Sequence, residues 1–91
     1  MKRIHRRLFS INEQLSRLEE EIAQAGAELE FHRAINDDAQ RDAAIGNYID
    51  REEAGLTAAD VRRFEKTISS LSARRDKLLT KRDRLLRSLP S

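Results

Sequence analysis

The chain of 91 residues has no cysteine and no tryptophan, and it holds only one proline and three glycines. Without cysteine, disulfide scaffolds and thiolate metal sites are excluded, and an oxidising compartment brings the chain no advantage. So little proline and glycine, with 37% charged and 38% apolar residues, is typical of long helices or coiled coils. We therefore expect an all-α, cytoplasmic protein with a thin apolar seam as its core.

Long apolar runs are also missing, since no stretch approaches the roughly 18 apolar residues of a membrane-spanning helix. The opening residues 1–7 are basic like the start of a signal peptide, but Ser10, Asn12 and Glu13 interrupt the apolar segment that should follow. We expect neither export by a signal peptide nor a span across a membrane.

A net charge of +2 conceals a strong segregation of charge along the chain. Residues 1–10 carry +4 and residues 73–91 carry +5, whereas residues 11–53 carry −8, from four arginines against twelve acidic residues. In a hairpin, both basic segments would lie at one end and the acidic turn at the other. A chain this short buries little surface on its own, so contacts with a partner are expected.

Apolar residues of the first half recur at alternating steps of four and three, the heptad spacing of a coiled coil. They are Ile4, Leu8, Ile11, Leu15, Leu18, Ile22, Ala25 and Leu29. The spacing predicts a helix over residues 2–45 with Gly46 at its C′ position. Ser10 and Glu13 also form a capping box, which would start the helix later.

The same phase next meets His32 and Asn36. We interpret them as a polar pair that fixes the register of packing, as buried asparagine does in coiled coils. A cation site at this place is the weaker interpretation, because no second histidine follows one turn later. Phe31 and Ile35 start a new stripe beside the old one, which predicts a change of register or of packing partner there.

The second helix has the clearest start signal in the chain. A capping box and a hydrophobic staple are formed by Leu56, Thr57, Asp60 and Val61. We therefore predict a connector over residues 46–56 and a helix over residues 57–89 that ends before Pro90. Its seam is expected at Val61, Phe64, Ile68, Leu71, Arg75, Leu78, Arg82, Leu85 and Leu89.

A seven-residue repeat in this helix places arginine in the seam and doubles the leucine beside it. A stripe this wide predicts contact with more than one helix. The simplest arrangement is a homodimer in which two antiparallel coiled-coil hairpins form a four-helix bundle. The predicted interface residues are Leu71, Leu78, Leu79, Leu85 and Leu86.

Catalysis needs an acid, base or nucleophile held in a pocket, and a two-helix seam offers no large pocket. The two histidines, His5 and His32, lie at different ends of the first helix. We therefore expect no enzyme, with no catalytic residue, metal or cofactor.

The basic end suits phosphate backbones or anionic nucleotides, because counterion release supplies affinity that does not depend on sequence. The anion-binding candidates are Arg3, Arg6, Arg7, Arg75 and Arg82. Alternatively, Glu19, Glu20 and Glu21 of the first helix neutralise residues 73–84 within the hairpin.

The opposite end is more apolar than a solvated turn requires, although acidic residues surround it. The apolar residues concerned are Phe31, Ile35, Tyr48 and Ile49. They either pack as a local cluster that Leu56 and Val61 close, or form a docking surface with a rim of carboxylates.

The layout resembles two kinds of helical hairpin that bind the transcription machinery. An acidic tip, from Asp37 to Glu53, is similar in layout to that of Gre-type factors of RNA polymerase, without their Gly-Asp-Leu or Asn-Ala-Glu-Tyr sequence. RsiG-type anti-sigma hairpins bind cyclic di-GMP through a motif that begins like Glu65 and Ser69, but Ser72 and Asp76 replace the arginine and glutamine that follow. The likeness implies shape alone.

These observations predict a non-catalytic protein-interaction module, a small regulator or adaptor that acts through coiled-coil packing. Its expected partners are a second copy of itself and another protein. The alternatives are nucleic-acid or anionic-nucleotide binding through the basic end, and an anti-sigma-like or polymerase-binding role.

Overall fold

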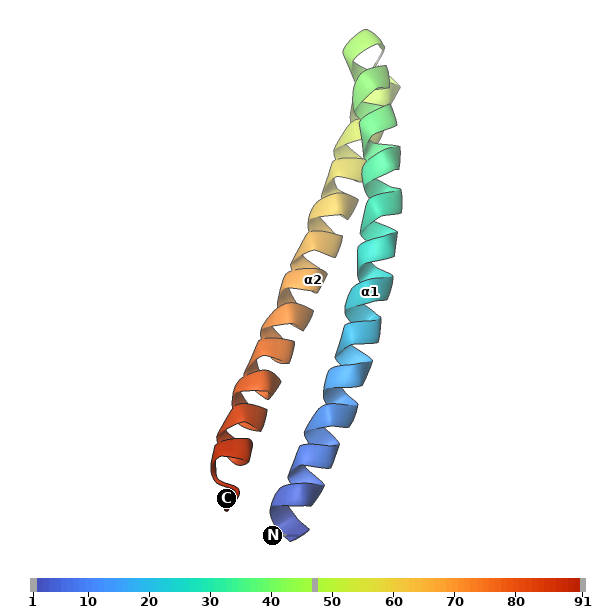
Figure 1. Cartoon of the computed structure of the whole chain (residues 1–91). Helices are drawn as coiled ribbons and strands as arrows, with labels where there is room; N and C mark the ends of the chain where they lie inside the picture. Colours follow the sequence, from blue (N-terminus) through green and yellow to red (C-terminus); the bar gives the residue numbers. More distant parts are fainter. Residues whose placement is uncertain (1, 47, 91) are drawn as a thin grey trace.

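The computed structural model describes residues 2–46 and 48–90, except for the side chain of Tyr48, and shows a hairpin of two long helices. Helix α1 (Lys2–Ile45) and helix α2 (Tyr48–Arg87) lie side by side along a body of 67 × 15 × 15 Å, with both ends of the chain at the same end (Figure 1). No strand occurs in the described ranges. The predicted all-α antiparallel hairpin is therefore confirmed, and so are the bounds of its first helix.

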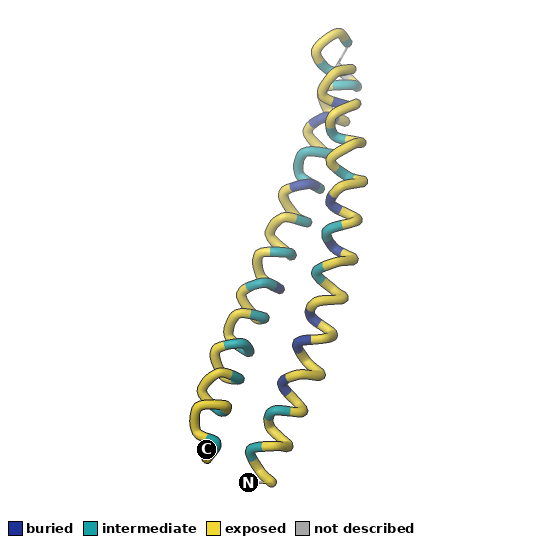
Figure 2. The backbone as a smooth tube through the Cα atoms, viewed as in Figure 1, coloured by how far each residue is buried: buried dark blue, intermediate teal, exposed yellow. Residues whose placement is uncertain are grey.

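The core is a single line of side chains between the two helices. Figure 2 shows buried and half-buried residues along the facing sides of the helices and exposed residues around the outside. The most enclosed side chains in the long apolar segment of α1 are Ile11, Leu15, Leu18, Ala25 and Leu29, all at 8% exposure or less. These are members of the predicted heptad seam, whose phase is thereby confirmed.

The predicted change of register beside His32 is wrong. The original phase continues past Asn36 to Ala39, which is 9% exposed. Phe31 and Ile35, the supposed new stripe, are 65% and 38% exposed. Small and polar side chains continue the seam here. Alanine is small enough for the two helices to pack closely, and the polar groups form hydrogen bonds between the helices.

Those partners form one polar layer between the helices. The hydroxyl of Thr57 donates to Oδ1 of Asn36 at 3.0 Å, and Nε2 of Gln40 donates to the same oxygen at 3.1 Å. The Gln40 amide also donates to the carbonyl oxygen of Ala54 at 3.1 Å. One turn away, the His32 ring stacks on Phe64 with centroids 4.6 Å apart. The polar pair thus faces α2, where our interpretation as a register element requires it to be.

The predicted start of the second helix at Thr57 is wrong. Helix α2 begins at Tyr48, so only residues 46 and 47 separate the helices, and Gly55 lies inside α2. Oγ1 of Thr57 lies 3.1 Å from the Ala54 carbonyl oxygen of its own helix, which is a second acceptor for the one hydroxyl proton. Leu56 is 65% exposed and forms no hydrophobic staple. The extra turns bring Ala54, at 4% exposure, against α1, and its carbonyl oxygen accepts a hydrogen bond from the Gln40 amide at 3.1 Å. These contacts and the backbone hydrogen bonds of the added turns together oppose a local cap signal of about 1 kcal/mol.

Gly46 is required at the reversal for space and not for a left-handed cap. No described glycine has a positive φ, so the predicted C′ conformation of Gly46 is not adopted. A Cβ at this position would instead collide with the carbonyl oxygen of Asp42 and the carboxylate of Asp50. The tight turn between α1 and α2 therefore depends on the absence of a side chain.

Candidate functional site

The buried seam divides the hairpin surface into two sides. Seam residues occupy heptad positions a and d, so positions b and e of both helices lie on one side and positions c and g on the other. An ion pair at 3.8 Å between Nη2 of Arg33 and Oε1 of Glu65 joins two e positions across the helices and identifies the b/e side. Each groove or exposed apolar surface described below lies on one of these two sides.

An open groove lies on the c/g side in the half of the hairpin that contains the chain ends. It has a volume of about 490 Å³. Its lining residues are Gln14, Arg17, Leu18, Glu21, Arg74, Lys77, Leu78 and Lys81. A smaller hollow of about 200 Å³ continues it toward the ends and adds Arg7, Ser10 and Ile11. The two hollows share Gln14, Leu78 and Lys81, so we treat them together as the basic groove.

The basic groove carries a concentrated positive charge over an apolar floor. Its cations are Arg7, Arg17, Arg74, Lys77 and Lys81, and its lining has one described carboxylate, that of Glu21. None of the five cations forms an ion pair with another described residue. Their charges are therefore open to a counterion or a partner, and the half-buried Leu78 side chain beneath them offers apolar contact.

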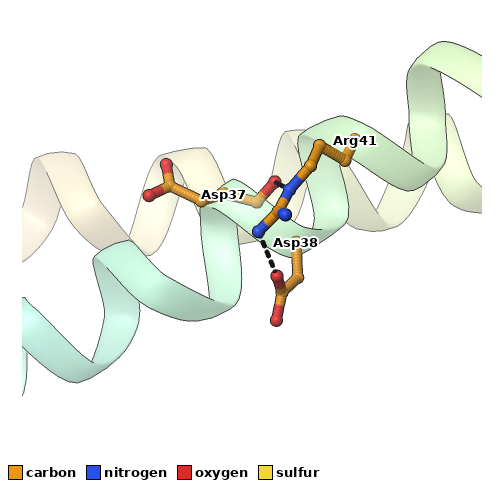
Figure 3. A network of polar contacts seen from close by, with 3 residues as sticks. All are labelled: Asp37, Asp38 and Arg41. Atoms are coloured by element: carbon orange, nitrogen blue, oxygen red, sulfur yellow. Dashed lines mark hydrogen bonds and ion pairs between the residues drawn. The ribbon is translucent and has the colours of Figure 1, made fainter.

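The alternative in which acidic residues of α1 neutralise residues 73–84 predicts ion pairs between the helices, and none joins these residues in the described structure. Within residues 2–46 and 48–90, only Arg33–Glu65 pairs charges between the helices. The other ion pairs lie within one helix, as for Nη2 of Arg41 and Oδ1 of Asp38 at 2.6 Å; Arg41 Nε also donates to the Asp37 carbonyl at 3.4 Å (Figure 3). Such exposed pairs contribute little stability.

The five anion-binding candidates of the sequence are only partly brought together. Arg7 lines the basic groove, while Arg3 and Arg6 are exposed beyond its lining. Arg75 and Arg82 belong to the seam: Nε of Arg75 contacts Oδ1 of Asp76 at 3.3 Å, and Nε of Arg82 is buried without a hydrogen-bond partner in the described structure. Placing two arginines in the seam was correct, but it removes them from the groove.

The cations that sequence reasoning did not single out share one signal. The groove takes Arg17, Arg74, Lys77 and Lys81, all of which occupy positions c or g of the heptads. Counting these positions from the seam would have found them, because c and g residues of antiparallel helices lie on the same side.

The c/g side of the other half of the hairpin is apolar and acidic, and we call it the tip surface. Its exposed apolar residues are Phe31 at 65%, Ile35 at 38%, Ile45 at 90%, Ile49 at 69% and Leu56 at 65%. Its acidic residues at the same heptad positions are Asp38, Asp42, Glu53 and Asp60. These apolar side chains do not form a buried local cluster, since Leu56 is exposed while Val61 is buried in the seam. The side chain of Tyr48 lies outside the described residues.

Three of the five leucines predicted for a dimer interface serve the seam of the hairpin itself. Leu71 is 8% exposed in a core with Leu18 and Ala25, Leu78 packs against this core, and Leu85 is half-buried in the seam. Leu79 is half-buried and Leu86 is 48% exposed, both at e positions. The b/e side thus carries two leucines that the seam does not fully bury.

No group of three or more His, Cys, Asp or Glu residues in the described chain is arranged to hold a metal ion. Among the same residues, no helix has the length and apolar character needed to cross a membrane.

Comparison of the chain with protein families, curated proteins and solved structures gives no match. A functional proposal for this hairpin therefore depends on its own residues and on the basic groove and tip surface that they form.

Proposed function

We propose that the hairpin is a non-catalytic protein-interaction module, an adaptor or regulator that binds through helix packing. One observation carries the proposal. The a/d seam runs from Ile11 to Ala39 of α1 with its apolar residues buried or half-buried, yet five large apolar side chains of the tip surface stay exposed on one side. Four of them, all but Ile35, are at least 65% exposed, so the packing of the hairpin leaves most of their surface uncovered.

The composition of the tip surface is that of a protein-binding site. Exposed apolar residues that are gathered together and edged by charge mark interaction surfaces. Burying a side chain of the size of isoleucine or phenylalanine contributes about 1.5 to 3 kcal/mol. Five of them together can offset a large part of the association cost, about 4 to 15 kcal/mol.

The test removes apolar surface without touching the seam. A variant with Phe31→Ser, Ile35→Ser and Leu56→Ser should keep its helical circular dichroism but lose the protein complexes that the parent forms in sedimentation and co-purification. Phe9→Ser is the matched control, because Phe9 is 67% exposed but lies on the b/e side. The parent complexes should survive high salt, since apolar contacts are not screened. A parent that forms no protein complex, or a triple variant that keeps every complex, contradicts the proposal.

Anion binding is the second candidate function, and the unpaired cations of the basic groove favour it. A nucleic-acid backbone or a nucleotide phosphate would find several cations side by side there. Fluorescence anisotropy with a labelled oligonucleotide should then show affinity that falls steeply with salt, by nearly one log unit per log unit of salt for each neutralised phosphate. Arg74→Gln with Lys77→Gln should reduce both the affinity and the salt slope, whereas Arg62→Gln with Arg63→Gln, in the other half of the hairpin, should not.

A further inference from the structure

We propose that the tip surface of a second copy of this chain occupies the basic groove, in a two-fold symmetric, antiparallel four-helix dimer. The inference rests on the proposed function and names one partner for it. It differs from the leucine interface expected from the sequence, because both surfaces lie on the c/g side. Leu79 and Leu86 stay outside it.

The two surfaces are complementary in charge and lie on the same side of the hairpin. Five cations without an ion pair to another described residue line the groove against one carboxylate, that of Glu21, and carboxylates at c and g positions edge the apolar tip. A two-fold axis that runs across the hairpin, perpendicular to its length, turns a second copy end for end and lays its c/g side on the first. Each tip then covers the groove of the other chain, and the assembly closes as a dimer.

The heptad positions of α2 fix where this axis lies. Lys81 and Glu53 are both g residues, and so are Arg74 and Asp60; Thr67 is midway between the members of each pair. An axis at the level of Thr67 therefore places Lys81 opposite Glu53 of the partner copy and Arg74 opposite its Asp60. Each pairing occurs twice, because the two-fold axis repeats it.

Helix α1 is compatible with the same axis. Arg17 of the groove and Asp38 of the tip surface are both c residues, placed almost symmetrically about Glu28. Asp38 and Asp60 already pair within their own helices, with Arg41 and Arg63. Exposed pairs of this kind contribute about 1 kcal/mol or less, so they exchange readily for contacts across an interface.

The proposed dimer also has apolar contacts and a buried area that suit a specific interface. Leu56 of the second copy comes to the level of Leu78, which forms part of the groove floor, and the stems of Lys77 and Lys81 can cover the neighbouring apolar tip. The contact extends about 40 Å along the helices over a hairpin 15 Å wide. It buries about 1,200 Å² in total, which lies at the lower end of the range for specific interfaces.

A parallel arrangement of the two copies is disfavoured by the same charges. It would place groove on groove and tip on tip, so that groove cations would face groove cations and tip carboxylates would face tip carboxylates, with Glu21 as the acidic residue among the groove linings. The antiparallel arrangement leaves a like-charge contact at its centre, since Glu28 lies near the axis and faces Glu28 of the other copy. Glu28→Gln should therefore tighten an antiparallel dimer, whereas in a parallel dimer Glu28 would face Thr67.

The experiment is a charge swap measured by sedimentation equilibrium at low salt. The tip variant carries Glu53→Lys and Asp60→Lys, and the groove variant carries Arg74→Glu and Lys81→Glu. Each variant alone should be monomeric, with the parent helical circular dichroism. An equimolar mixture should form a heterodimer, because basic tips then meet acidic grooves and both native contacts of the other pair are kept. The chain with all four substitutions should form a homodimer again.

Two kinds of result overturn the inference. One is dimerisation of both variants as strong as that of the parent, or a mixture that stays monomeric while both variants are folded. The other is a monomeric parent chain whose groove binds an oligonucleotide or polyphosphate, which identifies an anion as the occupant. A monomeric parent that still binds another protein through Phe31, Ile35 and Leu56 overturns this inference and leaves the proposed function standing.

Discussion

Replacing glycine by alanine should change stability in opposite directions at two places in this hairpin. Gly55 lies in the interior of α2, and a Cβ there would meet nothing within 4 Å. Glycine in a helix interior is less stable than alanine by about 0.5 to 1 kcal/mol. Gly55→Ala should therefore stabilise the fold by this amount. Gly26→Ala in α1 should do the same, since its Cβ also meets nothing within 4 Å.

Gly46→Ala should destabilise the hairpin, because the added Cβ would collide with the Asp42 carbonyl oxygen and the Asp50 carboxylate. Overpacking of this kind costs about 1 to 3 kcal/mol. Placing the substitution in an Asp50→Ala background should recover part of the loss and not all of it, since the backbone carbonyl of Asp42 remains. A double-mutant cycle separates this coupling from the effect of Asp50→Ala alone.

Thermal and urea unfolding followed by far-UV circular dichroism measures these changes. For a domain of this size, 1 kcal/mol corresponds to a shift of about 4 to 8 °C in Tm. The melts should be recorded at several protein concentrations, because association makes Tm depend on concentration. A loss of stability in Gly55→Ala would refute the helical assignment of residues 48–56 and restore the longer connector. An unchanged Tm in Gly46→Ala would refute the crowding at the turn.

Three more predictions address the seam and use the same unfolding assay. Leu18→Ala should lower the free energy of unfolding by about 2 to 5 kcal/mol, because Leu18 is 4% exposed. Leu86→Ala should lower it clearly less, since Leu86 is 48% exposed; equal losses would contradict the assignment of Leu18 to the buried seam. Asn36→Ala should cost about 1 to 2 kcal/mol. In a Thr57→Val background it should cost less, because the interhelical hydrogen bond is already removed and only the bond from Gln40 is still lost; fully additive losses would show that the interhelical bond is absent. Arg82→Met should raise stability by about 1 kcal/mol, since it removes a buried donor without a partner; a lower stability would show that the guanidinium is satisfied.

The sequence by itself determined the hairpin and the phase of its seam. Heptad spacing from Ile4 to Leu29 and from Val61 to Leu89 names the facing side of each helix, because a helix repeats its direction every 3.6 residues or so and apolar side chains must share one stripe. The seam arginines, Arg75 and Arg82, followed from the same count. Side-chain period is a local property, so no knowledge of the other helix was needed.

Only the tertiary structure decided where α2 begins, how the polar layer is paired and which charges remain unpaired. The capping signal at Thr57 is a local preference, and it lost to the contacts of the added turns with α1, which are visible only once the helices are side by side. In the same way, ion pairing depends on distances of about 4 Å between side chains of different helices. Neutralisation of residues 73–84 by acidic residues of α1 was one alternative open from the sequence, but Glu21 lies in the groove with these cations and forms no ion pair with them. Only the placed side chains show that the five cations of the basic groove form no ion pair with another described residue.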